Sequence, residues 1–186
     1  MKNKPGRVCP VENAGKLDSK IRRWFQNPEK ILRPYLKPGM TVLDFGCGPG
    51  FFTLDMARMV GASGRVIASD LQQGMLDKVS RKIQGTDLEN RISLHQCEKN
   101  RINLSEPIDF LFSFYVVHEV PDQKAIFREI NSMLKPNGKV FIAEPPVHVS
   151  SKAFHQTIDI AQEAGLRFVE KPGVFLSKTA VLVKGS

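Results

Sequence analysis

The sequence has few cysteines, and the three present are not arranged to form a bridge or a metal site. Cys9, Cys47 and Cys97 are an odd number, lie far apart and lack the short paired spacing of zinc ligands or of a redox dithiol. We therefore expect neither a disulfide framework nor a bound metal.

Long apolar runs are missing as well. The longest begins at Phe110, is interrupted by Ser113 and ends before His118, far short of the roughly 20 residues that a membrane-spanning helix needs. The basic N-terminus is followed by no apolar stretch that could form the core of a signal peptide. These absences predict a cytoplasmic protein with no membrane among its partners.

The composition is that of an ordinary globular protein, with 41% apolar and 25% charged residues in 186. The formal net charge of +8 could favour a nucleic acid, an acidic protein or an anionic small molecule as partner. The basic residues are dispersed, which is also typical of solvated helix faces. Charge alone does not choose among these alternatives.

From Thr41 onward, short apolar runs alternate with longer amphipathic stretches, a pattern that predicts a mostly parallel sheet covered by helices on both faces. The last two runs are joined by the turn-forming Lys171-Pro172-Gly173, so the sheet should end in an antiparallel hairpin. The expected fold is α/β and doubly wound, with about seven strands. The strands are expected at residues 41–45, 65–69, 92–95, 110–114, 139–143, 166–169 and 179–183, and the helices between the first five at 51–60, 72–84 and 123–134.

Helix ends are marked by residues suited to them. Asp122 and Ser150 or Ser151 can cap the helices that follow them, and Gly165 can end the second of these helices. The residues 100–107 between the third and fourth strands are not clearly helical. Two short helices at 17–26 and 28–36, separated by Asn27-Pro28, predict an N-terminal extension (1–40) that packs on the main domain (41–186).

A glycine-rich loop, Gly46-Cys47-Gly48-Pro49-Gly50, follows the first strand and precedes a helix. Glycine lets a ligand approach the main chain closely, at the strand end where open α/β sheets bind ligands. A dinucleotide-binding loop would have a third glycine where this chain has Phe51, and the Gly-Lys-Ser/Thr ending of a phosphate loop is absent. The loop therefore favours an adenosine-containing ligand without phosphates.

Asp70 ends the second apolar run, twenty residues beyond Gly50. An acid in this position of adenosine-binding α/β folds accepts hydrogen bonds from the ribose hydroxyls. The alternative is a surface aspartate that caps the helix expected at 72–84.

Together these features resemble the class I S-adenosyl-L-methionine (SAM)-dependent methyltransferases, in particular the UbiE/type 11-like branch, from about Thr41 to the C-terminus. Residues 42–50 resemble the first motif of that family, and residues 109–120, with His118-Glu119-Val120, resemble its fourth strand and the following segment. The resemblance implies a Rossmann-like methyltransferase sheet, SAM as cofactor and S-adenosyl-L-homocysteine (SAH) as product. It implies a cofactor pocket formed by Asp44, Gly46, Cys47, Gly48, Gly50, Asp70, Leu71, Met75, Glu98, Lys99 and Phe114.

Within this pocket the resemblance assigns Asp44 to the amino-acid end of SAM, Asp70 to the ribose and Met75 to the adenine. The chain departs from the family at the end of the third strand, where Cys97, Glu98 and Lys99 replace the usual Gly-Asp-Ala. Glu98 can still accept a hydrogen bond from the adenine amino group, and the backbone N–H of Lys99 can meet a ring nitrogen.

Methyl transfer from a sulfonium requires chiefly near-attack geometry in a dry pocket, so a dedicated catalytic residue is not obligatory. If the nucleophile carries a proton, His118 is the best candidate base, because its ordinary pKa lies near neutrality. Its alternative role is to brace the loop. Tyr115 and Glu119 are further candidates for the acceptor pocket, and Trp24 either closes over the site or packs against the domain.

The sequence thus predicts a SAM-dependent methyltransferase acting on a small-molecule acceptor, as a monomer or homodimer. Two alternatives remain: an RNA or protein methyltransferase that uses the basic surface, and a SAM-binding protein without catalysis. Enzymes that methylate base amino groups usually carry Asn/Asp-Pro-Pro-Tyr/Phe after the fourth strand, where this chain has Ser113-Phe114-Tyr115-Val116. Nucleic acid is therefore a possible but not a favoured partner.

Overall fold

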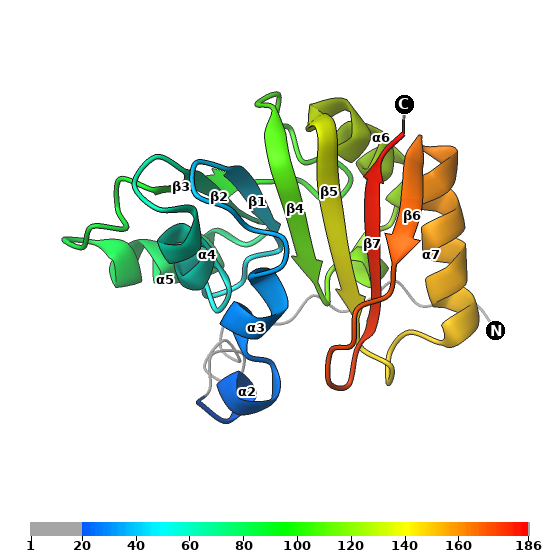
Figure 1. Cartoon of the computed structure of the whole chain (residues 1–186), viewed down its shortest axis with the longest axis horizontal. Helices are drawn as coiled ribbons and strands as arrows, with labels where there is room; N and C mark the ends of the chain where they lie inside the picture. Colours follow the sequence, from blue (N-terminus) through cyan, green and yellow to red (C-terminus); the bar gives the residue numbers. More distant parts are fainter. Residues whose placement is uncertain (1–19, 186) are drawn as a thin grey trace.

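A computed structural model of the chain describes residues 20–185, built around a sheet of strand order β3-β2-β1-β4-β5-β7-β6 (Figure 1). Strands β1 to β5 are parallel, and β7 runs antiparallel to both β5 and β6. The predicted doubly wound sheet with a terminal antiparallel hairpin is therefore confirmed. The strands are β1 (Thr41–Phe45), β2 (Arg65–Asp70), β3 (Ile92–Gln96), β4 (Ile108–Phe114), β5 (Leu134–Glu144), β6 (Leu166–Glu170) and β7 (Lys178–Lys184).

Helices pack on both faces of the sheet because each has one apolar side. Helices α3 (Pro28–Leu32), α4 (Thr53–Val60) and α5 (Gln73–Ile83) share a buried cluster with one face, which includes Leu32, Met56 and Val79. Helices α6 (Gln123–Met133) and α7 (Ser151–Glu163) cover the other face through Phe127 and Phe154. The remaining helices are α2 (Lys20–Phe25) and the single 3-10 turn η2 (Val117–Glu119).

The predicted helix ends are found at the expected residues. Asp122 accepts a hydrogen bond from the N–H of Ala125 at the start of α6, and Ser150 caps α7 in the same way. Asn27 accepts from the N–H of Lys30 ahead of α3. Gly165, with a φ of +94°, follows the last turn of α7 in the left-handed conformation that favours glycine.

Local predictions differ from the structure at α3 and β5. Helix α3 ends at Leu32, four residues before its predicted end; α2 ends at Phe25, and its predicted start at residue 17 lies outside the described part of the chain. Strand β5 begins at Leu134, five residues early, because Leu134 pairs with Ile108 across a register shift in β4. The division at residue 40 remains a prediction.

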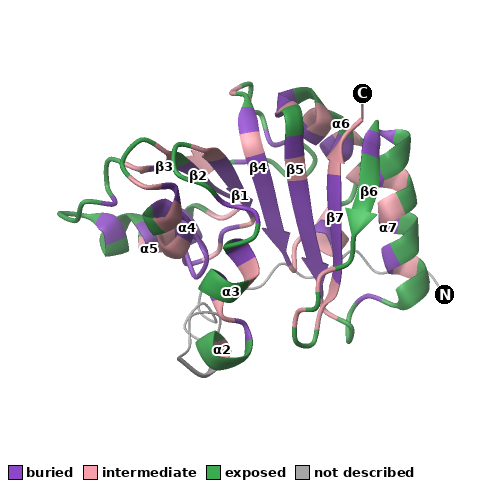
Figure 2. Ribbon diagram, viewed as in Figure 1, coloured by how far each residue is buried: buried purple, intermediate pink, exposed green. Residues whose placement is uncertain are grey.

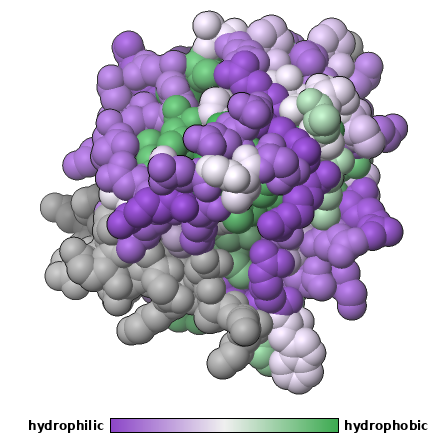
Figure 3. Space-filling view, turned by 90° about the vertical axis from the view of Figure 1, so that its left-hand side faces the viewer, coloured by the Kyte–Doolittle hydropathy of each residue, from purple (hydrophilic) through white to green (hydrophobic). Residues whose placement is uncertain are grey.

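The carboxyl ends of β1, β2, β4 and β5 meet at one end of the molecule; β1 and β4 are buried along nearly all of their length, and β5 over its second half (Figure 2). Strand β6 at the edge is largely exposed. The face on the side of β3 and α5 is mostly hydrophilic (Figure 3). Among residues 20–185, no helix has the length and apolar character needed to cross a membrane.

Candidate functional site

The glycine-rich loop leaves β1 with a sharp turn at the carboxyl end of the sheet. Gly46 has a φ of +74°, and a Cβ built on it would lie 2.2 Å from a methyl carbon of Val116. Gly48 has a φ of +53°, but nothing lies within 4 Å of its Cβ position. Gly46 is therefore required by protein packing, whereas Gly48 leaves open space beside the main chain.

The loop is fixed to the end of β2. The N–H groups of Gly46 and Cys47 both donate to the carbonyl of Ser69, at 2.8 and 2.9 Å. Asp70 accepts from the N–H of Gly48 at 2.9 Å through one carboxylate oxygen and from the N–H of Gln72 at 2.8 Å through the other. Asp70 therefore holds both the loop and the start of α5.

Asp70 is buried, with only 7% exposed, and so is not a surface residue, but it does accept a hydrogen bond at the start of α5, as the alternative expected. Burial raises its pKa, and the hydrogen bonds from the N–H groups of Gln72 and Gly48 oppose that rise. A carboxylate has about four acceptor positions, so two backbone bonds leave capacity for a ligand hydroxyl.

Asp44 lies on β1, two residues before the loop, and is 3% exposed. The hydroxyl of Thr53 donates to it at 2.6 Å. Burial raises the pKa of Asp44 to about 7; the bond from Thr53 and the charge of Arg22 lower it, and the charge of Asp70 raises it. A buried acid of this kind is well suited to meet a ligand cation.

Helix α2 reaches the same end of the sheet through Arg22 and Gln26. The Arg22 guanidinium lies 4.3 Å from the centroid of the Phe51 ring and 5.5 Å from that of Phe114. The Gln26 amide donates to the Tyr115 hydroxyl at 2.8 Å. Helix α2 therefore contacts both the loop after β1 and the segment after β4.

The segment after β4 carries His118, and β5 carries a partner for it. Nδ1 of His118 lies 2.5 Å from a carboxylate oxygen of Glu144, and the backbone N–H of His118 donates to the other oxygen at 3.2 Å. Glu144 is 1% exposed at the last position of β5. The ring of His148 is stacked on that of His118 with centroids 6.2 Å apart.

Several groups set the charge at this position. Burial lowers the pKa of His118, but the hydrogen bond and charge of Glu144, with the charge of Glu119, more than offset it, so the pKa lies above its ordinary value. Burial also raises the pKa of Glu119 to about 7, with the charge of His118 opposing. In the described part of the chain, Nε2 of His118 has no hydrogen-bond partner, so it is the ring nitrogen left to exchange a proton with a ligand.

The residues expected around adenine are more exposed than Asp44 and Asp70, apart from Met75. Met75 is buried and Leu71 half-buried, while Glu98 and Lys99 are exposed, with no hydrogen bond from either side chain among residues 20–185. Cys47 and Phe114 are buried in the apolar cluster shared with α4 and α5. The adenine contacts of Glu98 and Lys99 remain predictions.

Three of these residues, Glu144, Arg22 and Gln26, were not assigned to the site from the sequence. Glu144 could have been identified, because it is an acid at the end of an apolar strand, as Asp70 is. Arg22 and Gln26 could not, because their contacts join α2 to residues far along the chain.

The site fits the cofactor that the resemblance implies. The open space at Gly48 is a place where a ligand can approach the main chain, and the buried carboxylates of Asp44 and Asp70 flank it with acceptors. SAM carries an ammonium and two ribose hydroxyls as donors and no phosphate, which matches these acceptors.

Comparison with protein families finds a methyltransferase domain over residues 36–173. The chain is 37% identical over 110 residues to a demethylmenaquinone methyltransferase of Lactobacillus johnsonii, covering 59% of this chain and 45% of that protein. It is 29% identical over 109 residues to the ubiquinone/menaquinone biosynthesis C-methyltransferase UbiE of Shewanella baltica, covering 58% and 43%. The chain spans about half the length of these relatives.

Solved structures give a longer match. A SAM-dependent methyltransferase from Aquifex aeolicus superposes with a TM-score of 0.84 at 29% identity, over 95% of this chain and 98% of that one. A SAM-dependent methyltransferase from Mesorhizobium loti superposes with a TM-score of 0.70 at 15% identity, over 84% and 98%. The second likeness shows the fold alone.

Proposed function

Because the chain belongs to the methyltransferase-domain family, as a class I SAM-dependent methyltransferase of the UbiE-like branch, we propose that it methylates a small molecule bound beside His118. SAM is the cofactor. When bound, it supplies a methyl group on a sulfonium, which is activated for displacement without a metal. The chain must therefore bind, orient and exclude water, and manage one proton.

In this proposal Asp44 pairs with the ammonium of the cofactor and Asp70 accepts from the ribose. Asp44 is buried at the start of the loop, and a cation beside it would favour its ionised form. Gly48 lets the ligand lie against the main chain. The Arg22 guanidinium, whose charge already acts on Asp44, lies on the same side of the loop.

The 2.5 Å contact between His118 and Glu144 carries the catalytic part of the proposal. A carboxylate on Nδ1 fixes the orientation of the imidazole and leaves Nε2 to accept a proton. Nucleophiles that carry a proton, such as an aromatic hydroxyl or the ring carbon beside one, need such a base as the new bond forms.

The relatives named for demethylmenaquinone and ubiquinone biosynthesis suggest the class of acceptor. We infer a quinol or related hydroxylated ring as the acceptor. Removal of a ring hydroxyl proton by His118 increases the electron density at the neighbouring carbon, which would take the methyl group as the bond from sulfur to methyl breaks and SAH leaves. The proton on that ring carbon would then be lost and the oxygen reprotonated, so that one proton is released in all.

Titration calorimetry with SAM and SAH tests the cofactor part. Wild type should bind both, Asp70→Ala should bind at least tenfold more weakly, and Asp87→Ala, an exposed aspartate paired with Arg91, should bind like wild type. Failure of wild type to bind would refute the proposal. Binding of SAM without methylation of any hydroxylated ring compound would instead identify a non-catalytic SAM-binding protein.

A further inference from the structure

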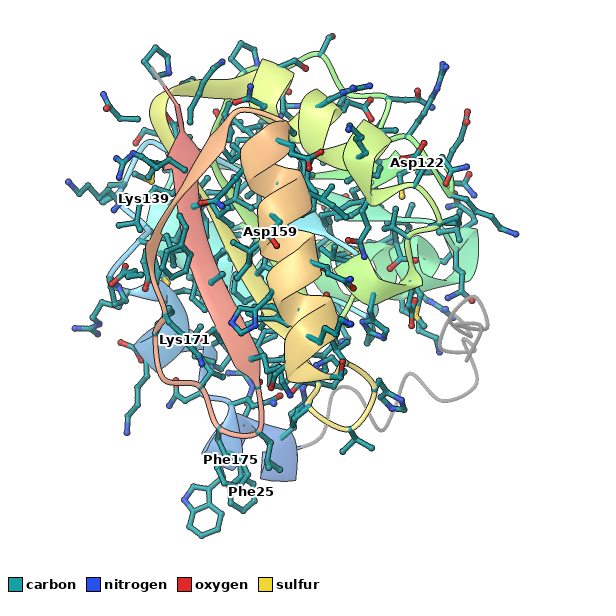
Figure 4. All side chains as sticks on the ribbon, turned by 90° about the vertical axis from the view of Figure 1, so that its right-hand side faces the viewer. Phe25, Asp122, Lys139, Asp159, Lys171 and Phe175 are labelled. Carbon is teal, nitrogen blue, oxygen red and sulfur yellow. The ribbon has the colours of Figure 1, made fainter. Side chains whose placement is uncertain are left out.

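An exposed apolar cluster lies at the same end of the molecule as the candidate site. Trp24 and Phe25 on α2 are 82% and 46% exposed, and Phe175 and Leu176 on the connection from β6 to β7 are 52% and 63% exposed. We call these four residues the aromatic tip. Figure 4 shows Phe25 and Phe175 side by side at the lower edge of the molecule.

The aromatic tip is formed by two segments far apart in the sequence. The rings of Phe25 and Phe175 are stacked with centroids 5.0 Å apart, and those of Trp24 and Phe25 are 4.9 Å apart. The Tyr115 hydroxyl donates to the carbonyl of Leu176 at 2.9 Å and so ties the connection to the segment after β4. A clustered set of exposed large apolar side chains marks an interaction surface, whereas single ones do not.

Positive charge borders the tip. A groove of about 270 Å³ between α2–α3 and the connection from β6 to β7 is lined by Trp24, Phe175 and Lys30. Lys171, at the start of that connection, does not line the groove and lies farther from the tip than Lys30 (Figure 4). In the described part of the chain, neither Lys30 nor Lys171 forms an ion pair, whereas Arg33 is paired with Glu29 and Arg23 with Asp55. Neither ammonium is therefore held in a direct ion pair, although Glu29 and Glu170 adjoin the two lysines in the sequence.

We propose that the aromatic tip docks on the surface of an anionic phospholipid bilayer. Tryptophan and phenylalanine side chains partition into the interfacial region of a bilayer, and lysines beside them are attracted to anionic headgroups. A second copy of the chain fits less well, because a symmetric contact would bring Lys30 and Lys171 of both copies together in a molecule of net charge +8.

Peripheral docking needs no spanning helix. The sequence-based expectation of no membrane partner depended on the lack of such a helix, so it does not bear on this kind of contact. Docking by the tip would place the carboxyl end of the sheet, with His118, next to the lipid phase. This proposal does not depend on the proposed acceptor.

Trp24 is the only tryptophan in the chain, so its fluorescence reports on the tip directly. Phosphatidylglycerol vesicles should shift its emission to shorter wavelength, and brominated lipid in those vesicles should quench it. Phosphatidylcholine vesicles should give at least tenfold weaker binding. Lys30→Gln and Lys171→Gln should each weaken binding to phosphatidylglycerol about fivefold.

The double variant Phe175→Ser/Leu176→Ser should lose vesicle binding in a flotation assay. Its matched control is Phe168→Ser/Val169→Ser, which removes two apolar side chains of β6 that are 38% and 44% exposed. The proposal is overturned if phosphatidylglycerol neither shifts nor quenches Trp24, if both double variants behave alike, or if the tip instead mediates a dimer in sedimentation velocity. SAH binding by calorimetry, expected to be unchanged in both double variants, separates this result from a failure of the proposed function.

Discussion

At the scale of single residues, the imidazole of His118 is controlled by acids on two different segments. Glu144 supplies a hydrogen bond and a charge from β5, and Glu119 supplies a further charge from η2. Both favour the protonated ring, so the neutral form needed for a base is reached only at higher pH. Burial opposes them and lowers the pKa of His118, and Glu144 supplies most of what raises that pKa above its ordinary value.

We expect Glu144→Gln to lower kcat by about 10² with little change in the KM for SAM, since acid–base catalysis typically contributes that much or more. The ascending limb of the pH–rate profile should move to lower pH, because the variant loses the charge that raises the pKa of His118. Steady-state kinetics from pH 6 to 9 measure both effects. An unchanged kcat in Glu144→Gln and in His118→Ala would show that the dyad only braces the loop.

The sequence predicts residues of the site where one short segment carries the signal. Asp44, Asp70 and His118 each follow an apolar run and could be found in that way. The partner of His118 could not be identified, because the contact depends on which strand lies beside β4 in the folded sheet. Long-range pairing of this kind is not encoded in local patterns.

At the scale of elements, the loop between β1 and α4 separates a glycine needed by the protein from one suited to a ligand. We expect Gly46→Ala to destabilise the chain by roughly 2–5 kcal/mol, from a left-handed φ and a clash with Val116. Gly48→Ala should cost only about 1–2 kcal/mol, yet weaken SAM binding at least tenfold.

Thermal denaturation and calorimetry on both variants check this contrast, and Gly46→Ala/Val116→Ala should regain part of the lost stability. Equal loss of SAM affinity in Gly46→Ala and Gly48→Ala, both still folded, would contradict the assignment of the open space at Gly48 to the cofactor.

Most elements were predictable because their apolar periodicity is strong and their ends carry Asp, Ser, Asn or Gly. The wrong element boundaries are those set by contacts with residues distant in the sequence. Strand β5 starts earlier than predicted because Leu134 pairs with Ile108 of β4. The sequence around residue 134 does not indicate this pairing. The position of helix α2 is set by two contacts with residues far along the chain: Arg22 lies over the ring of Phe51, and Gln26 donates to the hydroxyl of Tyr115.

At the scale of the whole molecule, buried acids make stability depend on pH. Burial raises the pKa of Asp44 from 3.8 to about 7, and that of Glu119 from 4.5 to about 7. Both bind protons more tightly in the folded chain than in the unfolded one, so their stabilising contribution is complete below pH about 4 and is lost as the pH rises through about 7. His118, with its raised pKa, acts in the same direction.

We therefore expect a lower Tm at pH 8 than at pH 6 in the absence of ligand. Asp44 alone should contribute about 1 kcal/mol, or roughly 2–4 °C. Scanning calorimetry measures the difference, which should shrink in Asp44→Asn and with saturating SAH, whose ammonium would stabilise the ionised acid. A Tm that rises from pH 6 to pH 8 would contradict this account.

Helix α2 also has a consequence for how fast ligands exchange. Its described residues reach the site through side chains, Arg22 on Phe51 and the following Gln26 on Tyr115, and not through backbone pairing with the sheet. It can therefore detach and return while the sheet remains intact. Side-chain contacts of this kind break and re-form faster than a sheet, so spent cofactor should leave quickly, and inhibition by product should be brief even where its equilibrium affinity is high.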